Sequence, residues 1–120
     1  PDTLSEVAVT ADLGSARLHG VIDRLVIEDD RILAVDFKTN QTVPGHPADC
    51  PDGILRQMAA YAVALGQVYP DRRIETAILW TNTCTLMPLP HEIVMASLHD
   101  TRYLDASAGA SYVSGPSTAL

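Results

Sequence analysis

The chain has 120 residues, of which 47% are hydrophobic and 19% charged, a composition that suits one globular domain with a modest core. The formal net charge of −7 argues against a freestanding nucleic-acid-binding protein, because phosphate contacts normally come from an excess of Lys and Arg. No apolar run approaches the roughly 20 residues of a membrane span, and the opening residues lack the pattern of a signal peptide. These features predict a cytoplasmic protein without membrane contact.

The first third of the chain predicts strands separated by turns. Residues 17–28 and 32–39 are rich in the β-branched residues that strands favour, and the intervening "DDR" predicts that they form an antiparallel hairpin. A shorter strand is expected over residues 7–10. Residues 40–53, crowded with Pro, Gly, Asn and Asp, are expected to form an irregular loop.

The remainder predicts two helices and two further strands. Apolar residues recur at three- and four-residue spacing over 54–68, which indicates an amphipathic helix. Strands are expected at 74–82 and 85–90. A closing helix is expected over 90–104, with Pro90 near its first turn.

The resulting order, β-β-β-α-β-β-α, indicates a mixed α/β domain over residues 1–105, with a helix crossing over between strands of one sheet. Residues 106–120 are small, polar and Gly/Pro-bearing, and are expected to form a flexible tail. Trp80 is expected to pack in the core at a strand end.

Cysteine and histidine spacing argues against two classes of metal site. Cys50 and Cys84 lie far apart and outside any CxxC or paired-histidine pattern. We therefore expect ordinary thiols, with neither a zinc site nor an iron–sulfur cluster. His91 and His99 are separated by roughly two helical turns, too far to chelate one metal together.

Three charged residues fall at one end of the predicted hairpin: Asp23 on its first strand, with Asp36 and Lys38 on its second. Residues of equal parity share a face of a strand, so Asp36 and Lys38 point the same way. Two carboxylates supply the hard oxygen ligands that Mg²⁺ or Mn²⁺ prefers. A lysine beside them can orient the attacking water or neutralise charge gathering on phosphorus.

A plainer interpretation of the same residues is open. Asp36 and Lys38 would form a surface ion pair, and Asp23 would pair with Arg17 or Arg24. A DxK triplet alone does not distinguish these interpretations. On the predicted helix, Gln57 and Tyr61 share a face, where they could bind a nucleic-acid backbone or steady the lysine, or else be a surface glutamine and a half-buried tyrosine.

The ordered set "GVIDRL", "AVDFKTN" and "LRQMAAYAVAL" resembles the RecB-type nuclease domain of the PD-(D/E)XK superfamily, especially the C-terminal nuclease domain of the AddA subunit of the AddAB helicase-nuclease. The resemblance runs from about Glu6 to Leu89. It implies a restriction-endonuclease-like α/β fold, a mixed sheet flanked by helices. It also implies a Mg²⁺- or Mn²⁺-dependent deoxyribonuclease that processes double-strand-break ends for recombinational repair, and leaves exonuclease and endonuclease cutting open.

Carried over to this chain, the resemblance implies that Asp23 and Asp36 bind the metal together with the backbone carbonyl of Phe37. Lys38 becomes the catalytic lysine. The implied partners are DNA, helicase domains of the same parent chain and a second helicase-nuclease subunit.

Gln57 and Tyr61 match the family's QxxxY motif, which implies that they hold the DNA and the active-site groups in place. Gly20, in its "GxxDR" context, would let a backbone approach closely, although a strand bulge explains it equally well. Arg24 and Arg56, which lie within the quoted motifs, are the first candidate DNA contacts. The wider set of possible phosphate contacts is Arg17, Arg24, Arg56, Arg72 and Arg73.

The chain departs from the family in two respects. The family carries a further metal ligand, commonly a histidine, on a helix upstream of the first strand, and this chain is expected to lack that helix. His19 is a poor substitute, because it would lie about 13 Å from Asp23 along the strand. The acidic net charge predicts weak DNA binding by the isolated chain, with DNA delivered by other domains.

Two rival hypotheses belong to other functional classes. A catalytically silent nuclease-like scaffold or subunit contact would tolerate loss of Lys38. A small acidic interaction domain would be favoured if Asp23 and Asp36 proved to be far apart or on opposite sides of the sheet. The role of Glu6, which matches a glutamate common in the family, is open.

Overall fold

The computed structural model describes residues 2–12 and 17–99. Its strands are β1 (Asp2–Asp12), β2 (Arg17–Ile27), β3 (Arg31–Lys38), β4 (Arg73–Trp80) and β5 (Thr85–Leu89). Its helices are α1 (Asp52–Val68) and α2 (His91–Ala96), with single 3₁₀ turns at Pro47–Asp49 and Ser97–His99. In the described part of the chain, no helix combines the length and apolarity needed to cross a membrane.

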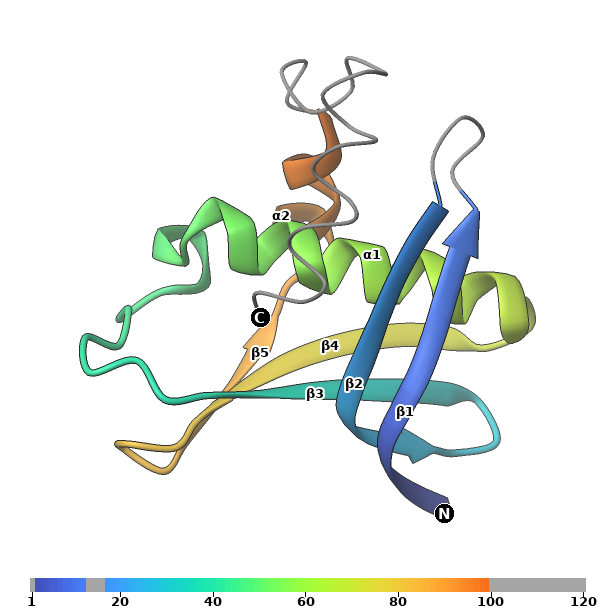
Figure 1. Cartoon of the computed structure of the whole chain (residues 1–120), viewed down its shortest axis with the longest axis horizontal. Coiled ribbons are helices and arrows are strands. Elements are labelled where there is room, and N and C mark those ends of the chain that lie inside the picture. Colours follow the sequence, from blue (N-terminus) through green and yellow to red (C-terminus); the bar gives the residue numbers. More distant parts are fainter. Residues whose placement is uncertain (1, 13–16, 100–120) are drawn as a thin grey trace.

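The five strands form one mixed sheet in the order β1-β2-β3-β4-β5. β3 and β4 are parallel, whereas the other neighbouring strands are antiparallel. Parallel neighbours need a long crossover, which α1 provides between β3 and β4 (Figure 1). The predicted α/β class and element order are therefore confirmed.

The core lies between the sheet and α1. Ile32 and Ala34 of β3 are fully buried and belong to one cluster with Met58 and Leu65 of α1. Their alternation on the strand and their spacing on the helix explain why these segments form these elements. Burying each large apolar side chain contributes roughly 1.5–3 kcal/mol. Trp80, at the end of β4, is also fully buried, as predicted.

β2 belongs to two pairings of different length. It pairs with β1 from Arg17 to Ile27, but with β3 only from Arg24 to Ile27. Its first half therefore separates from β3, and the β1–β2 hairpin lies across α1 (Figure 1). This full-length hairpin makes β1 longer than the strand predicted at 7–10, because ladder hydrogen bonds extend it into residues without alternating hydrophobicity.

The closing helix predicted over 90–104 begins as expected, directly after Pro90, but its predicted length is wrong, since α2 ends at Ala96. The Ser97 hydroxyl donates to the Val94 carbonyl at 2.6 Å, and such side-chain bonds compete with helical hydrogen bonding. A 3₁₀ turn follows. Residues 100–104 of that prediction, and the predicted tail, lie outside the described residues. Cys50 is a buried free cysteine and Cys84 an exposed one.

Candidate functional site

Asp23 and Asp36 come together where β2 separates from β3. The antiparallel register pairs Arg24 with Val35, and one further step along it sets Asp23 opposite Asp36. Directly opposite residues of an antiparallel pair lie on one face. The two carboxylates are therefore neighbours, which removes the condition that would have favoured an acidic interaction domain.

The carboxylate of Asp23 ends the β2–β3 ladder. Its Oδ2 accepts a hydrogen bond from the Phe37 backbone N–H at 2.8 Å. Because β2 turns away from β3 at this point, the side chain takes the position that a carbonyl of a continuing strand would occupy. The backbone N–H is satisfied and Asp23 is held beside Asp36.

Asp36 and Lys38 form a buried ion pair. They are 3% and 8% exposed, and Lys38 Nζ lies 2.8 Å from Asp36 Oδ2. The geometry is that of an ion pair only, since Oδ2 has no well-aligned hydrogen-bond partner. Both residues are therefore part of the interior, which rules out the plainer interpretation of a surface ion pair.

The pKa of Asp36 is raised from 3.8 to about 6. Burial is the main cause, because it disfavours the charged carboxylate. Lys38 opposes the rise, whereas the nearby Asp23 carboxylate adds to it. A cation between the two carboxylates would offset both the desolvation and the repulsion.

A directed chain of hydrogen bonds joins Lys38 to β2 through α1. Lys38 Nζ donates to Gln57 Oε1 at 3.0 Å, and Gln57 Nε2 donates to Tyr61 Oη at 2.7 Å. Tyr61 Oη in turn donates to the Val21 carbonyl at 2.8 Å. The i,i+4 spacing of Gln57 and Tyr61 places them on one helix face and makes their contact possible.

Tyr61 is a buried phenol, 3% exposed. Burial raises its pKa well above the usual value, and the charge of Asp36 raises it further. The hydroxyl therefore keeps its proton and can act as the donor to Val21. Gln57, by contrast, is half-buried.

The first two candidate DNA contacts differ in exposure. Arg24 is exposed, whereas Arg56 is only 8% exposed, which disfavours direct contact with phosphate. Arg17 is exposed at the start of β2. Arg72 lies over the Tyr69 ring, with 5.2 Å between its Cζ and the ring centroid. The parallel register places Arg73 beside Arg31, at the other end of β4 from the Lys38–Trp80 pair.

Two features beside these residues could not be found from sequence patterns. One is the Val21 carbonyl, because any residue would supply the same backbone oxygen. The other is the backbone of Glu6, which has φ 53° and lies opposite Asp23, between the Ser5–Arg24 and Val7–Ile22 pairs. His19 is exposed and contacts Thr10 across the hairpin.

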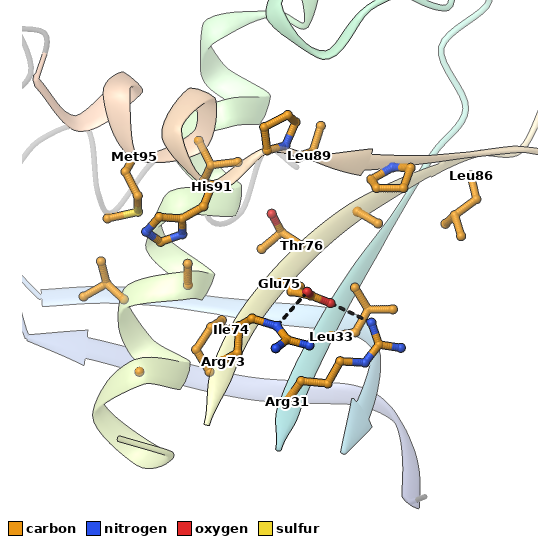
Figure 2. Close-up of a pocket in the computed structure, with 17 residues that line it drawn as sticks. Arg31, Leu33, Arg73, Ile74, Glu75, Thr76, Leu86, Leu89, His91 and Met95 are labelled. Atoms are coloured by element: carbon orange, nitrogen blue, oxygen red, sulfur yellow. Dashed lines mark hydrogen bonds and ion pairs between the residues drawn. The ribbon is translucent and has the colours of Figure 1, made fainter. Parts of the chain in front are cut away.

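A separate groove of about 940 Å³ lies along β4 and α2. Figure 2 shows Leu33, Leu86 and Met95 among its apolar side chains. Its lining includes Arg73 from the wider set of possible phosphate contacts, but none of the predicted metal ligands or catalytic residues. At its rim, Glu75 binds both Arg31 and Arg73. These arginines are already neutralised by carboxylates, so the groove lacks the free cations of a phosphate site.

The donor set beside Lys38 fits a hard divalent cation. Among the described residues, no three His, Cys, Asp or Glu side chains are grouped to hold a metal ion. Mg²⁺, however, commonly takes only one or two protein carboxylates and fills its other positions with water and substrate phosphate. The facing carboxylates of Asp23 and Asp36 suit that mode of binding.

Comparison with known proteins gives the family. Residues 1–101 match the family model of the PD-(D/E)XK nuclease superfamily, and no curated protein matches the chain. A solved structure titled "Crystal structure of SSO0001" is 12% identical with a TM-score of 0.45, and the alignment covers 86% of this chain and 50% of that one. The chain thus spans about half the length of that structure. The five-stranded mixed sheet flanked by helices is the α/β architecture that was expected. The chain belongs to the PD-(D/E)XK nuclease superfamily.

Proposed function

We propose that this chain is a Mg²⁺- or Mn²⁺-dependent DNA nuclease that hydrolyses phosphodiester bonds. The observation that carries the proposal is the pairing of Asp23 and Asp36 beside the buried ammonium of Lys38. Two carboxylates and one amine on the same face provide both cation ligands and a positive charge for phosphoryl transfer.

Asp23 and Asp36 would hold the cation, with the Phe37 carbonyl as a further ligand. The Phe37 N–H points toward Asp23. In an antiparallel ladder the N–H and C=O of one residue point to the same side, so its carbonyl faces Asp23 as well. A bound Mg²⁺ or Mn²⁺ polarises the scissile phosphate and neutralises negative charge in the transition state.

Lys38 is the group that acts on the reacting phosphate or on the attacking water. It is the single lysine of the sequence, and its ammonium is fixed between Asp36 and Gln57. A preorganised positive charge in a buried site stabilises charge development without reorganising solvent. Gln57 and Tyr61 hold this ammonium in place.

In the cell, we propose that this nuclease acts as part of a helicase-nuclease that processes double-strand-break ends. The support is the resemblance of three ordered motifs to the AddA type. The partners would be DNA, helicase domains and a second subunit. The net charge of −7, the burial of Arg56 and the pairing of Arg73 with Glu75 favour delivery of DNA by those partners.

A cleavage assay with Mg²⁺ or Mn²⁺, and with chelator as blank, tests the activity. Lys38→Met is expected to lower kcat about 100-fold or more. The matched control is Arg31→Met, which removes an ion-paired cation from the other end of β3 and is expected to retain activity.

Metal binding is tested separately by calorimetric titration of Mn²⁺ into the chain and its Asp36→Ala variant. Binding that disappears in the variant would support the carboxylate site. Absence of both cleavage and Asp36-dependent binding in the unmodified chain would reject the nuclease proposal in favour of a silent scaffold.

A further inference from the structure

We propose that Gly20 is a positioning residue for Lys38, acting through the ring of Tyr61 and the amide of Gln57. The inference rests on the proposed function for its catalytic meaning, but its structural part stands on contacts alone. Gly20 touches neither Lys38 nor the carboxylates in this proposal. Its contribution is the space that it leaves.

Space, not backbone shape, requires a glycine at position 20. Gly20 pairs with Val9 in the regular β1–β2 register, so the alternative of a strand bulge is wrong. A Cβ built there would lie 2.7 Å from Tyr61 Cε1, a distance that real Cβ contacts essentially never show. The Tyr61 ring therefore rests directly on the backbone of β2.

The other described glycines with assessed surroundings do not share this constraint. A Cβ at Gly45 or Gly66 would meet nothing within 4 Å, and one at Gly53 would meet only Arg56 Nη2 at 4.0 Å. Gly20 alone among these four has an aromatic ring where its side chain would be. The contact marks one particular position on β2, the residue directly before Val21, whose carbonyl ends the chain of hydrogen bonds.

The Tyr61 ring has little freedom to move away from a new methyl group. It is 3% exposed, and its hydroxyl is held at both ends by the Val21 carbonyl and the Gln57 amide. Bonds of 2.7 and 2.8 Å weaken when the oxygen moves by about 1 Å, because hydrogen bonds are short-ranged. Displacement of the ring is therefore transmitted to Gln57.

The hydrogen-bond directions give this displacement a specific result. The Lys38 ammonium can only donate and the Val21 carbonyl can only accept, so the groups between them have one favourable orientation. If Gln57 Nε2 loses Tyr61 Oη, its amide is free to rotate. A rotated amide would present N–H to the ammonium and leave Lys38 bound to Asp36 alone.

The first experiment compares Gly20→Ala with Gly66→Ala, a matched control whose new methyl group meets open space. Because Lys38 is the single lysine, the chain labelled with [ε-¹³C]lysine gives one side-chain NMR signal. Gly20→Ala is expected to shift and broaden this signal, and Gly66→Ala to leave it unchanged. A Lys38 signal in Gly20→Ala identical to that of the unmodified chain would overturn the proposal.

A double-mutant cycle, measured by kcat, tests whether Gly20 acts through the Tyr61 hydroxyl. Gly20→Ala is expected to lower kcat about 10- to 100-fold. In a Tyr61→Phe background it should lower kcat no further, since the relay is already broken. Losses that multiply would contradict the relay. If the unmodified chain cleaves no DNA, the proposed function fails, while the lysine signal still decides the positioning.

A third comparison applies if Gly20→Ala alone does not fold. Tyr61→Leu removes the ring that meets the new methyl group, so Gly20→Ala should fold in that background as well as Tyr61→Leu itself. Equal loss of stability with and without the ring would show that the methyl group does not act through Tyr61, and the proposal would be rejected.

Discussion

The Lys38 ammonium lies 2.8 Å from the Asp36 carboxylate, and their side chains are only 9% and 4% exposed. Each charge therefore depends on the other for compensation, and removing one partner from such a pair is strongly destabilising. Asp23 adds a second negative charge at the same place. The site is arranged for one more positive charge than the described side chains provide.

Stability should depend on pH through Asp36. Its pKa is about 6 in the folded chain against an ordinary value of 3.8. Between these values the folded state holds the proton more tightly than the unfolded state, so this group's contribution to the free energy of unfolding falls as pH rises. The fall is on the order of 2–3 kcal/mol from pH 4 to pH 7.

Asp36→Asn removes this dependence. Urea unfolding at pH 4 and pH 7 measures the free energy of unfolding of both proteins. From pH 4 to pH 7 the stability of the variant relative to the unmodified chain should rise by that amount, because only the unmodified chain loses the Asp36 contribution. If the free energy of unfolding changed equally with pH in the two proteins, Asp36 would not be the titrating group.

Cation affinity should have the opposite pH dependence. Mn²⁺ and a proton compete for the Asp36 carboxylate, so affinity should rise about tenfold per pH unit below pH 6 and level off above it. Calorimetric titrations at pH 5, 6 and 7 measure this. An affinity independent of pH would place the bound cation elsewhere.

Tyr61→Phe should destabilise the chain by about 1–3 kcal/mol, because it leaves the half-buried Gln57 amide without its acceptor and the Val21 carbonyl without its donor. Urea unfolding measures the loss. Tyr69→Phe is a suitable control, since that ring is half-buried and stacks on Arg72. Equal effects of the two substitutions would contradict a special role for the Tyr61 hydroxyl.

Cys84→Gly should stabilise the chain by about 1 kcal/mol, because a side chain in the left-handed region is unfavourable and glycine is not. Cys84 is exposed and has φ 54° in the turn between β4 and β5. Cys84→Ser keeps the Cβ and should give no gain. A thermal unfolding series of the three proteins distinguishes the backbone effect from loss of the thiol.

Local patterns were sufficient to predict the elements that carry the site. Alternation on β3 placed Asp36 and Lys38 on one face, and helical spacing placed Gln57 beside Tyr61. Both predictions depend only on the period of a strand or helix. The end of α2 was missed because the competing Ser97 hydroxyl bond acts over a single turn.

Features set by packing between distant segments were not predictable. Arg56 was expected at the surface, but α1 is covered by the sheet and by the β1–β2 hairpin, so its buried side is broader than one apolar stripe. The role of Gly20 likewise depends on where the hairpin lies on Tyr61. Neither burial nor contact follows from residue spacing.

The pairing of β2 makes assembly of the site all-or-none. One short stretch of this strand supplies Gly20, the Val21 carbonyl and Asp23. A slip of one residue would turn Asp23 to the other face and remove the acceptor of Tyr61 at the same time. A chain with shifted β2 pairing would therefore lack the site altogether and would not have a partly active one. The active fraction of a preparation should then equal the fraction of chains with the correct register.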